Sequence, residues 1–328
     1  MTLRVRIIEA KRQLREPFEI AGRVFIEMPV LYLELADRDG HIGCAEAAGV
    51  DYEGETTATM RAQLDAVVSR LSDATTPADI QSWLPRGGAR NALDCALWDL
   101  QAKRSGVPAW QAAGLPSQAP RVTASNIGLG SPAYTRRQAQ ALAGAQIIKL
   151  KVDAKRHLEL VRAVREVAPK AELWIDANQS WSRPLLVQLL PELLDLRISL
   201  IEQPVKRGED AQLDGLRSPI PLVADESCMD RQSLPNLVSR YQGVNIKLDK
   251  TGGLTEALAL AGAAQEQGLA LMAGNMCGSS LGIAPAFLIA QLARWVDLDG
   301  PRFLRVDHEP SMRYADGALY PPMSALWG

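Results

Sequence analysis

Hydrophobic and polar positions divide the chain into an amino-terminal part and a longer periodic part. Residues 4–10 alternate between apolar and polar, and residues 30–43 hold two apolar runs around an Asp-Gly turn signal, so we expect a β meander here. From about residue 56 to residue 113 the pattern becomes helical, and Gly106 after two basic residues is a helix stop. These patterns predict an α+β domain over residues 1–115.

Short apolar runs alternate with helical segments through most of the remaining chain. Five successive runs close on a polar residue, at Lys151, Asp176, Glu202, Asp225 and Lys247. These positions are 25, 26, 23 and 22 residues apart, which is about the length of a strand, a helix and two loops. With the apolar runs at 122–127, 269–274 and 293–298, the count reaches eight strands. We therefore predict an α/β fold with a TIM-type barrel over residues 116–306, and residues 307–328 returning to the first domain.

Composition and charge narrow the class of protein. The 328 residues are 47% hydrophobic and 23% charged, which is typical of a globular protein and excludes a disordered chain. Thirty-six basic against 38 acidic residues give a net charge of -2 with no basic block, so we expect no nucleic-acid partner. The uncharged stretch 267–293 is long enough to span a bilayer, but Asn275, Pro285 and several glycines interrupt it. We interpret it as buried barrel and expect no membrane partner.

The cysteines and the amino terminus indicate the compartment. Cys44, Cys95, Cys228 and Cys277 lie far apart without a Cys-x-x-Cys pair, which argues against a structural zinc site and fits a reducing compartment. The amino terminus mixes charged with apolar residues and lacks the continuous apolar region of a signal peptide. We expect a cytoplasmic protein.

Three of the closing residues are carboxylates. Asp176, Glu202 and Asp225 end three consecutive predicted strands, and each follows a strongly apolar run. The carboxyl ends of the strands converge in a TIM-type barrel, so these side chains are expected to face one small volume. Such carboxylates repel one another unless a cation holds them, and Mg²⁺ prefers oxygen ligands. We predict a Mg²⁺ site; the alternative for each acid alone is a helix cap or a loop ion pair.

Lysines occupy the strands on either side of these acids. Side chains alternate across residues 147–152, so Lys149 and Lys151 share one face while the apolar residues share the other. The apolar face must pack on the helices, which turns both lysines into the barrel. Lys247 closes the sixth of the eight predicted strands and faces Lys151, on the second, across the barrel. For Lys250, which lies beyond that strand, we expect a solvated ammonium.

Two lysines on opposite sides of a metal site indicate a type of reaction. A lysine near a divalent cation and other lysines has a lowered pKa and can act as a neutral base. Lys151 and Lys247 are therefore placed to remove the α-proton of a carboxylate substrate from one face and return a proton on the other. The arrangement predicts racemisation or epimerisation.

Several motifs, in their order and spacing, carry a family resemblance. KLK, DANQSW, EQP, ADES and NIKLDKTGG resemble the enolase superfamily and its muconate-lactonising-enzyme subgroup. The resemblance covers essentially the whole chain and implies a modified TIM barrel, (β/α)7β, with an N-terminal α+β capping domain. It implies Asp176, Glu202 and Asp225 as Mg²⁺ ligands, Lys151 and Lys247 as the acid/base pair, and Lys149 as a neighbour that polarises the substrate carboxylate.

The eighth predicted strand carries two more acids. WVDLDGP places Asp297 and Asp299 two residues apart, on one face at the barrel mouth, where paired carboxylates suit a substrate ammonium. Here the chain resembles the dipeptide epimerases, in which this Asp-x-Asp binds the free amino terminus. The resemblance implies a Mg²⁺-dependent isomerase that inverts the α-carbon of the carboxy-terminal residue of a dipeptide, with L-Ala-D/L-Glu favoured, in cell-wall peptide metabolism. The alternative for the two aspartates is an ordinary acidic loop.

Two further residues are candidate substrate contacts. Asn126 lies at the end of the first barrel strand, where these epimerases often carry a threonine, and Arg23 lies in a cap loop. An arginine favours an acidic substrate side chain, whereas the cap acids Asp51, Glu53 and Glu55 favour a basic one. The second residue of the dipeptide therefore stays open.

Other functions stay open beside this one. A cycloisomerase, an o-succinylbenzoate synthase or an N-acylamino acid racemase uses the same scaffold, but those substrates have no ammonium and would leave Asp297 and Asp299 unexplained. A more distant alternative is a barrel that binds a ligand without catalysis, because a fold does not fix a function. Nothing in the sequence indicates an oligomeric state, so a homo-oligomer stays open too.

Overall fold

An antiparallel three-stranded sheet begins the chain, in a computed structural model that describes residues 2–20 and 22–328. Its strands, in order, are β1 (Arg4–Ile20), β2 (Arg23–Ala36) and β3 (Ile42–Ala47). The Asp37 carboxylate accepts hydrogen bonds from the backbone N–H groups of Asp39 and His41, which closes the turn between β2 and β3. The predicted β meander is confirmed.

Helix α2 (Gly88–Ser105) covers this sheet and is the central element of the cap. Most of its residues are buried, because one side packs on β2 and β3 while the other meets the barrel. It ends as the sequence predicts: Gly106 adopts the left-handed conformation, with a φ of 69°. The preceding stretch is less helical than expected, since α1 (Thr57–Asp65) is followed over residues 66–87 by loops and short 3₁₀ turns.

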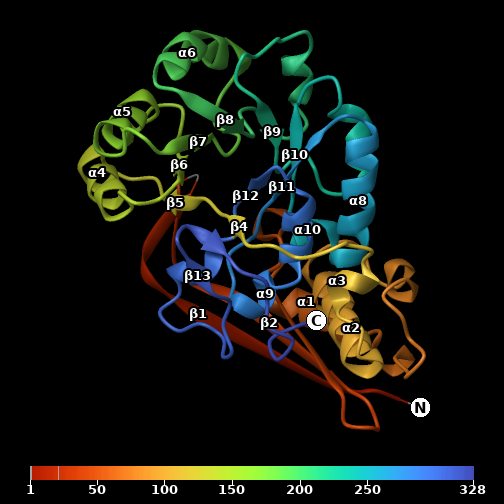
Figure 1. The fold of residues 1–328 in the computed structure, drawn as a ribbon. Helices are drawn as coiled ribbons and strands as arrows, with labels where there is room; N and C mark the ends of the chain where they lie inside the picture. Colours follow the sequence, from red (N-terminus) through yellow and green to blue (C-terminus); the bar gives the residue numbers. More distant parts are fainter. Residues whose placement is uncertain (1, 21) are drawn as a thin grey trace.

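Eight parallel strands, hydrogen-bonded to one another in sequence order, form the barrel. They are β5 (Ser125–Ile127), β6 (Ile147–Lys151), β7 (Glu172–Asp176), β8 (Ile198–Glu202), β9 (Leu222–Ala224), β10 (Gly243–Ile246), β11 (Ala270–Ala273) and β12 (Trp295–Val296). A backbone hydrogen bond from Ala124, just before β5, to Val296 in β12 connects the two ends of the sheet. Figure 1 shows the strands around one axis with helices outside them and the cap on one side. The predicted barrel is confirmed.

The outer layer is less regular than a strict alternation of strand and helix. Its longer helices are α4 (Pro132–Ala141), α5 (Leu158–Val167), α6 (Arg183–Asp195), α8 (Leu254–Glu266) and α10 (Ala286–Leu292). After β8 and after β9, in segments that the structure describes in full, 3₁₀ turns at Asp210–Leu213 and Arg231–Asn236 replace α-helices. Both segments contain proline, and the first also contains two glycines, which disfavour a longer helix.

The run predicted as the first barrel strand divides into two. Its start lies in β4 (Arg121–Val122), which pairs with β14 (Ala318–Leu319) outside the barrel, and only its end joins the barrel sheet. β14 in turn pairs with β13 (Tyr314–Ala315). At the carboxyl end of the chain, the indole N–H of Trp327 donates to the carbonyl of Cys95 in α2 at 3.0 Å. These contacts hold the last residues against both the barrel and the cap.

The uncharged stretch 267–293 lies inside the barrel domain, as predicted. It forms β11, α9 (Ser280–Ile283) and α10, and most of its large apolar side chains, such as Phe287, are buried. Among the described residues, no helix combines the length and the apolarity needed to cross a lipid bilayer.

Alternation along the strands places an apolar floor beneath the acids. Trp174, Leu200 and Val223 belong to a small buried cluster of their own, separate from the core between strands and helices. The residues that follow them on the strands, such as Ile175 and Ile201, belong to that larger core. The next position on the inner face of each strand is Asp176, Glu202 or Asp225.

The cap also holds the segment that carries Lys247. Directly after Lys247, the short helix α7 (Leu248–Thr251) packs against α2. Asp249 accepts a hydrogen bond from the Asn91 side chain at 3.1 Å, and Arg90 donates to the last carbonyl of α7 at 2.7 Å. Lys247 is thus fixed from two sides, by its strand and by the cap.

Candidate active site

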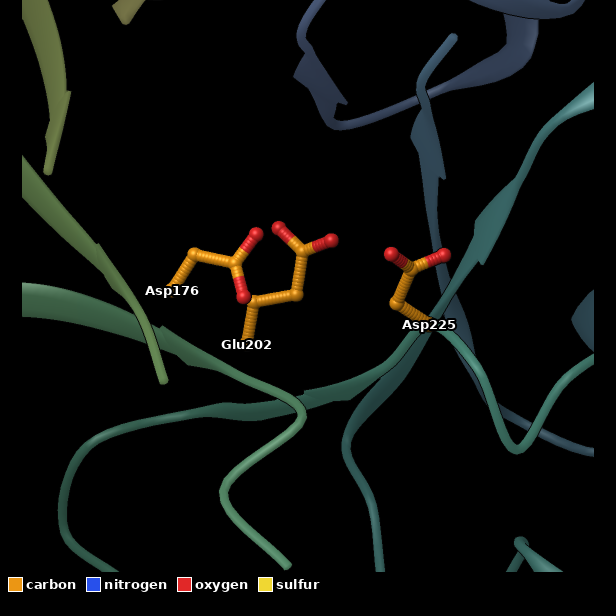
Figure 2. Close-up of side chains that lie close together, drawn as sticks. All are labelled: Asp176, Glu202 and Asp225. Atoms are coloured by element: carbon orange, nitrogen blue, oxygen red, sulfur yellow. The ribbon is translucent and has the colours of Figure 1, made fainter. Parts of the chain in front are cut away.

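The carboxylates of Asp176, Glu202 and Asp225 lie together at the carboxyl ends of β7, β8 and β9. One oxygen from each lies within 4.8 Å of the other two, and all three side chains are buried. Figure 2 shows the three carboxylates gathered at the ends of neighbouring strands. Among the described residues, this is the one group of three or more acidic, histidine or cysteine side chains close enough to share a metal ion.

Lysines neutralise this acidic group from both ends. The Lys151 ammonium lies 2.5 Å from Asp176 Oδ2, and the Lys247 ammonium lies 2.6 Å from Asp225 Oδ2. Lys151 ends β6 and Lys247 follows β10, the second and sixth strands of the barrel. The structure therefore places the two lysines at opposite ends of the acidic group, as their positions on the second and sixth predicted strands indicate.

Lys149 connects the acidic group to a second pair of acids. Its buried ammonium lies 2.6 Å from Glu202 Oε2, 3.3 Å from Asp176 Oδ2 and 2.7 Å from Asp297 Oδ2. The contact with Glu202 is an ion pair without hydrogen-bond geometry, so this buried oxygen receives no hydrogen bond from any described residue. The sequence resemblance assigns Lys149 to the substrate carboxylate; here its charge is engaged by three protein carboxylates.

Burial and the neighbouring carboxylates act in opposite directions on the pKa values of Lys149 and Lys247. Burial alone would lower the pKa of Lys247, but the charges of Asp225 and Glu202 outweigh it and raise that pKa above its usual value. The pKa of Lys149 is raised in the same way, with Asp297 as its largest opposing charge. For Lys247, the protein groups alone thus do not give the lowered pKa that the sequence suggests. A cation bound to the same carboxylates would act in the direction of a lower pKa.

This set of donors fits a hard divalent cation. Three carboxylate oxygens from neighbouring strands are the ligands that Mg²⁺ prefers. Burial, aided by the charge of Asp176, raises the pKa of Glu202 to about 7. A cation at the acidic group would stabilise the ionised form of Glu202. Glu202 Oε2, which receives no hydrogen bond, could then serve as a ligand of that cation.

Asp297 and Asp299 follow β12 and are both buried beside Asn126. The Asn126 side-chain amide donates to Asp297 Oδ1 at 2.5 Å and to Asp299 Oδ1 at 2.9 Å, and its backbone N–H donates to Asp299 Oδ2 at 2.8 Å. Burial and the charge of Asp297 raise the pKa of Asp299 to about 7. The structure brings these three predicted residues together and joins them to the acidic group through Lys149.

The cap holds further charges, which are mostly exposed. Arg23, expected in a loop, is the first residue of β2. Arg23 Nη1 lies 2.5 Å from Asp51 Oδ2, with side chains 60% and 37% exposed. Glu53 pairs with Arg207, and Glu55 accepts the first backbone N–H of α2 at 2.9 Å. The structure does not bring Arg23 into contact with the other predicted site residues. The three cap acids expected to favour a basic substrate are each engaged by the protein.

Two residues that the sequence analysis did not assign to the site support its carboxylates. The expectation of a solvated Lys250 is wrong: the side chain is fully buried, and its ammonium donates to two oxygens of Asp225 and to the Asn245 carbonyl. The Asn245 side chain donates to Glu202 Oε1 at 2.8 Å. Asn245 could have been predicted, because it lies two residues before Lys247 and alternation places both on the inner face. Lys250 was not, because it lies in α7, where strand alternation no longer applies.

The fold and the site define a class of protein: an α+β cap on a parallel eight-strand barrel, with acids on three successive strands and lysines on either side, as in the enolase superfamily. Comparison with known families agrees. The chain matches "Mandelate racemase / muconate lactonizing enzyme, N-terminal domain" over residues 2–114 and "Enolase C-terminal domain-like" over residues 134–324. It belongs to the mandelate racemase/muconate lactonizing enzyme family of the enolase superfamily.

Two named relatives are similar to this protein over nearly the whole chain. L-Ala-D/L-Glu epimerase of Escherichia coli K12 is 40% identical over 318 residues, covering 96% of this chain and 99% of the relative. N-acetyl-D-glutamate racemase of a Pseudoalteromonas species is 40% identical over 301 residues, covering 91% of this chain and 95% of the relative.

Solved structures of enolase-superfamily proteins are also similar to this chain over nearly its whole length. An enolase family member from Agrobacterium tumefaciens with homology to dipeptide epimerases, solved with sodium and L-Ala-L-Glu, has a TM-score of 0.96 at 37% identity, covering 99% of this chain and all of the other. A dipeptide epimerase from Methylococcus capsulatus, solved with Mg and L-Arg-D-Lys, has a TM-score of 0.90 at 29% identity, covering 98% of both chains.

Proposed function

We propose that this protein is a Mg²⁺-dependent dipeptide epimerase that inverts the α-carbon of the carboxy-terminal residue, with L-Ala-L-Glu and L-Ala-D-Glu as substrates. The observation that carries the proposal is the position of the buried Asp297–Asp299 pair, one lysine away from the acidic group. A dipeptide with a free amino terminus has an ammonium at one end and a carboxylate at the other. The pair suits the first, and a cation at the acidic group suits the second.

Asp176, Glu202 and Asp225 would hold the metal in this proposal. The buried set of three oxygen donors supports it, and so does the Mg in the structure of the Methylococcus epimerase. Bound there, Mg²⁺ would supply positive charge that stabilises the negative charge growing on the substrate carboxylate as the α-proton leaves.

Lys151 and Lys247 would carry the proton. They contact opposite ends of the acidic group, so a planar carbon held between them presents one face to each lysine. Following the family resemblance, we assign the (S) carbon to Lys247 and the (R) carbon to Lys151. Each lysine must first release its carboxylate partner. The lysine that acts as the base must also be neutral, and it removes the α-proton, while the other keeps its ammonium proton and delivers it to the opposite face.

Arg23 supports an acidic side chain on the carboxy-terminal residue of the substrate. Its side chain is more than half exposed, and it pairs with Asp51 at the start of a 3₁₀ turn in the cap. A glutamate side chain of the substrate can share or replace that partner. The L-Ala-L-Glu in the Agrobacterium structure supports the same class of substrate.

A second candidate is an N-acylamino acid racemase, which the Pseudoalteromonas relative favours. An N-acetylated substrate also presents a carboxylate and an α-proton to the acidic group and the lysines. It carries no ammonium, and so leaves the buried Asp297 and Asp299 without a cationic partner from the substrate.

Parallel assays of two substrates test the proposal. The purified protein is incubated with L-Ala-L-Glu or with N-acetyl-L-glutamate, with Mg²⁺ or with a chelator, and inversion is followed by chiral chromatography. We expect Mg²⁺-dependent inversion of the dipeptide alone. Inversion of N-acetylglutamate without the dipeptide would favour the second candidate, and inversion of neither would refute both.

A further inference from the structure

We propose that Lys250 is a positioning residue that fixes the orientation of Asp225 and thereby makes the metal site selective for Mg²⁺ over Ca²⁺. The inference rests on the proposed function, because it takes Asp225 as a metal ligand. It concerns a residue outside the acid/base pair that the sequence analysis expected to find in solvent.

Two of the three contacts of Lys250 are with a single residue. Its ammonium lies 2.5 Å from the backbone carbonyl oxygen of Asp225 and 2.6 Å from Asp225 Oδ1. A donor bound at once to the backbone and the carboxylate of one aspartate closes a ring that restrains both side-chain dihedral angles of that aspartate. The third contact, 2.9 Å to the Asn245 carbonyl, anchors the ammonium to β10.

Lys250 cannot easily give up these contacts. Its side chain is fully buried, and its three ammonium protons meet three oxygens. An ammonium without partners in such a place is costly. The restraint on Asp225 is therefore permanent as long as the protein is folded.

Lys247 and Lys250 divide the carboxylate of Asp225 between them. Lys250 takes Oδ1, while Lys247 takes Oδ2 at 2.6 Å. In the proposed function Lys247 must leave Oδ2 to reach the substrate, whereas Lys250 stays. Asp225 then offers one free oxygen to a metal ion, in an orientation that Lys250 alone maintains.

A carboxylate with one available oxygen favours the smaller ion. Mg²⁺ requires nearly ideal octahedral geometry with short bonds, whereas Ca²⁺ accepts more ligands, longer bonds and carboxylates that bind through both oxygens. If Lys250 were absent, Asp225 could rotate and present both Oδ1 and Oδ2. That change suits Ca²⁺ more than Mg²⁺.

The ratio of two affinities separates this geometric effect from the effect of charge. Loss of the Lys250 ammonium removes one positive charge near the site, which favours the binding of any divalent cation. Mg²⁺ and Ca²⁺ carry the same charge, so this contribution largely cancels in the ratio of their dissociation constants. A shift of the ratio reports the orientation of Asp225.

The test compares the full-length wild type with Lys250→Met and Lys250→Gln. The dissociation constants of Mg²⁺ and of Ca²⁺ are measured by isothermal titration calorimetry, without substrate. We expect the ratio to move toward Ca²⁺ by about tenfold in Lys250→Met, the lower end of the usual effect of losing a residue that orients a metal ligand. Lys250→Gln keeps an N–H donor, and should show a smaller shift in the same direction. Ratios within about twofold of the wild type in both variants would overturn the proposal.

Lys103→Met is the matched control. Lys103 also pairs with a buried carboxylate, at 2.7 Å from Asp99, but both residues lie in α2 and outside the site. This variant should leave the ratio unchanged, and a shift equal to that of Lys250→Met would also overturn the proposal. Failure of both Lys250 variants to fold would also overturn the proposal, because Lys250 would then serve the stability of the fold and not the orientation of Asp225. A wild type that binds neither ion would instead refute the metal site of the proposed function.

Discussion

The barrel mouth and the cap loops hold their charges in different ways. At the barrel mouth, ion pairs such as Lys151 with Asp176 are buried and bridge neighbouring strands. In the cap loops, Arg23 and Asp51 form a pair whose side chains are 60% and 37% exposed. The barrel charges are thus held in buried ion pairs between adjacent strands, whereas the cap pair is a single contact between exposed side chains.

This difference separates the chemistry from the choice of substrate. Removing one partner of a buried pair typically costs about 3–5 kcal/mol, whereas an exposed pair is worth about 1 kcal/mol or less. Changes at Arg23 or Asp51 should therefore lower the stability of the fold little, while changes at Asp176 or Lys151 should lower it more. The similar structures agree with this view, since one was solved with L-Ala-L-Glu and another with L-Arg-D-Lys on the same fold.

The largest effect is expected from Asp225→Asn at the barrel mouth. The variant removes the charge of one proposed metal ligand and leaves Lys247 and Lys250 without their Asp225 carboxylate partner. Loss of metal assistance costs several kcal/mol, so epimerisation should fall by about 10³-fold or more. The rate is measured together with bound metal. Full activity of the variant, or of the wild type after exhaustive chelation, would exclude a role for the metal.

A smaller but still large effect is expected from the aspartate pair. Asp297→Asn removes a carboxylate bound to Lys149 and, in our proposal, to the substrate ammonium. We expect kcat/KM for L-Ala-L-Glu to fall by about 10²-fold, as for the loss of one partner of a buried pair. Acetylation of the substrate amine should produce a loss of similar size in the wild type. Equal turnover of free and acetylated dipeptide would contradict the ammonium site.

The cap pair should give opposite effects when its two members are changed. Arg23→Met should raise KM for L-Ala-L-Glu by about fivefold, because an exposed charge contact is worth about 1 kcal/mol. Asp51→Asn should lower KM, because it frees Arg23 for the substrate. L-Ala-L-Ala, which lacks the side-chain carboxylate, is the control substrate and should not respond. If both variants change KM in the same direction, Arg23 is not the contact.

The smallest effect is a dependence on pH. The pKa of Asp299 is raised from 3.8 to about 7, so this carboxyl gains a proton as the pH falls from 7.5 to 6 and loses its attraction for the substrate ammonium. The substrate amine, with a pKa of about 8, stays charged over most of this range. KM should therefore rise severalfold toward low pH. Asp299→Asn should remove the dependence, and an unaltered profile in that variant would assign it to another group.

Most of the barrel site could be predicted from the sequence, because period and alternation determine it. The spacing of the apolar runs gives the strands, and alternation then turns Lys149 and Lys151 inward. The burial of Lys250 could not be predicted, because it depends on how a one-turn helix packs against α2 of the cap and directs Lys250 toward Asp225. The pairing of Arg23, the first residue of β2, with Asp51, the first residue of a 3₁₀ turn, joins two segments that no periodic pattern aligns.

Exchange of the α-proton with deuterium oxide tests the central claim, that Lys151 and Lys247 act on opposite faces of one carbon. The substrate is L-Ala-L-Glu, exchange and inversion are read by mass spectrometry and chiral chromatography, and metal content is checked in each variant. We predict that Lys247→Ala abolishes exchange from the L,L substrate, while Lys151→Ala blocks inversion and still permits exchange with retention. Each base contributes about 10² to 10⁴ in rate. Inversion at wild-type rates in both variants, with metal still bound, would contradict the two-lysine mechanism.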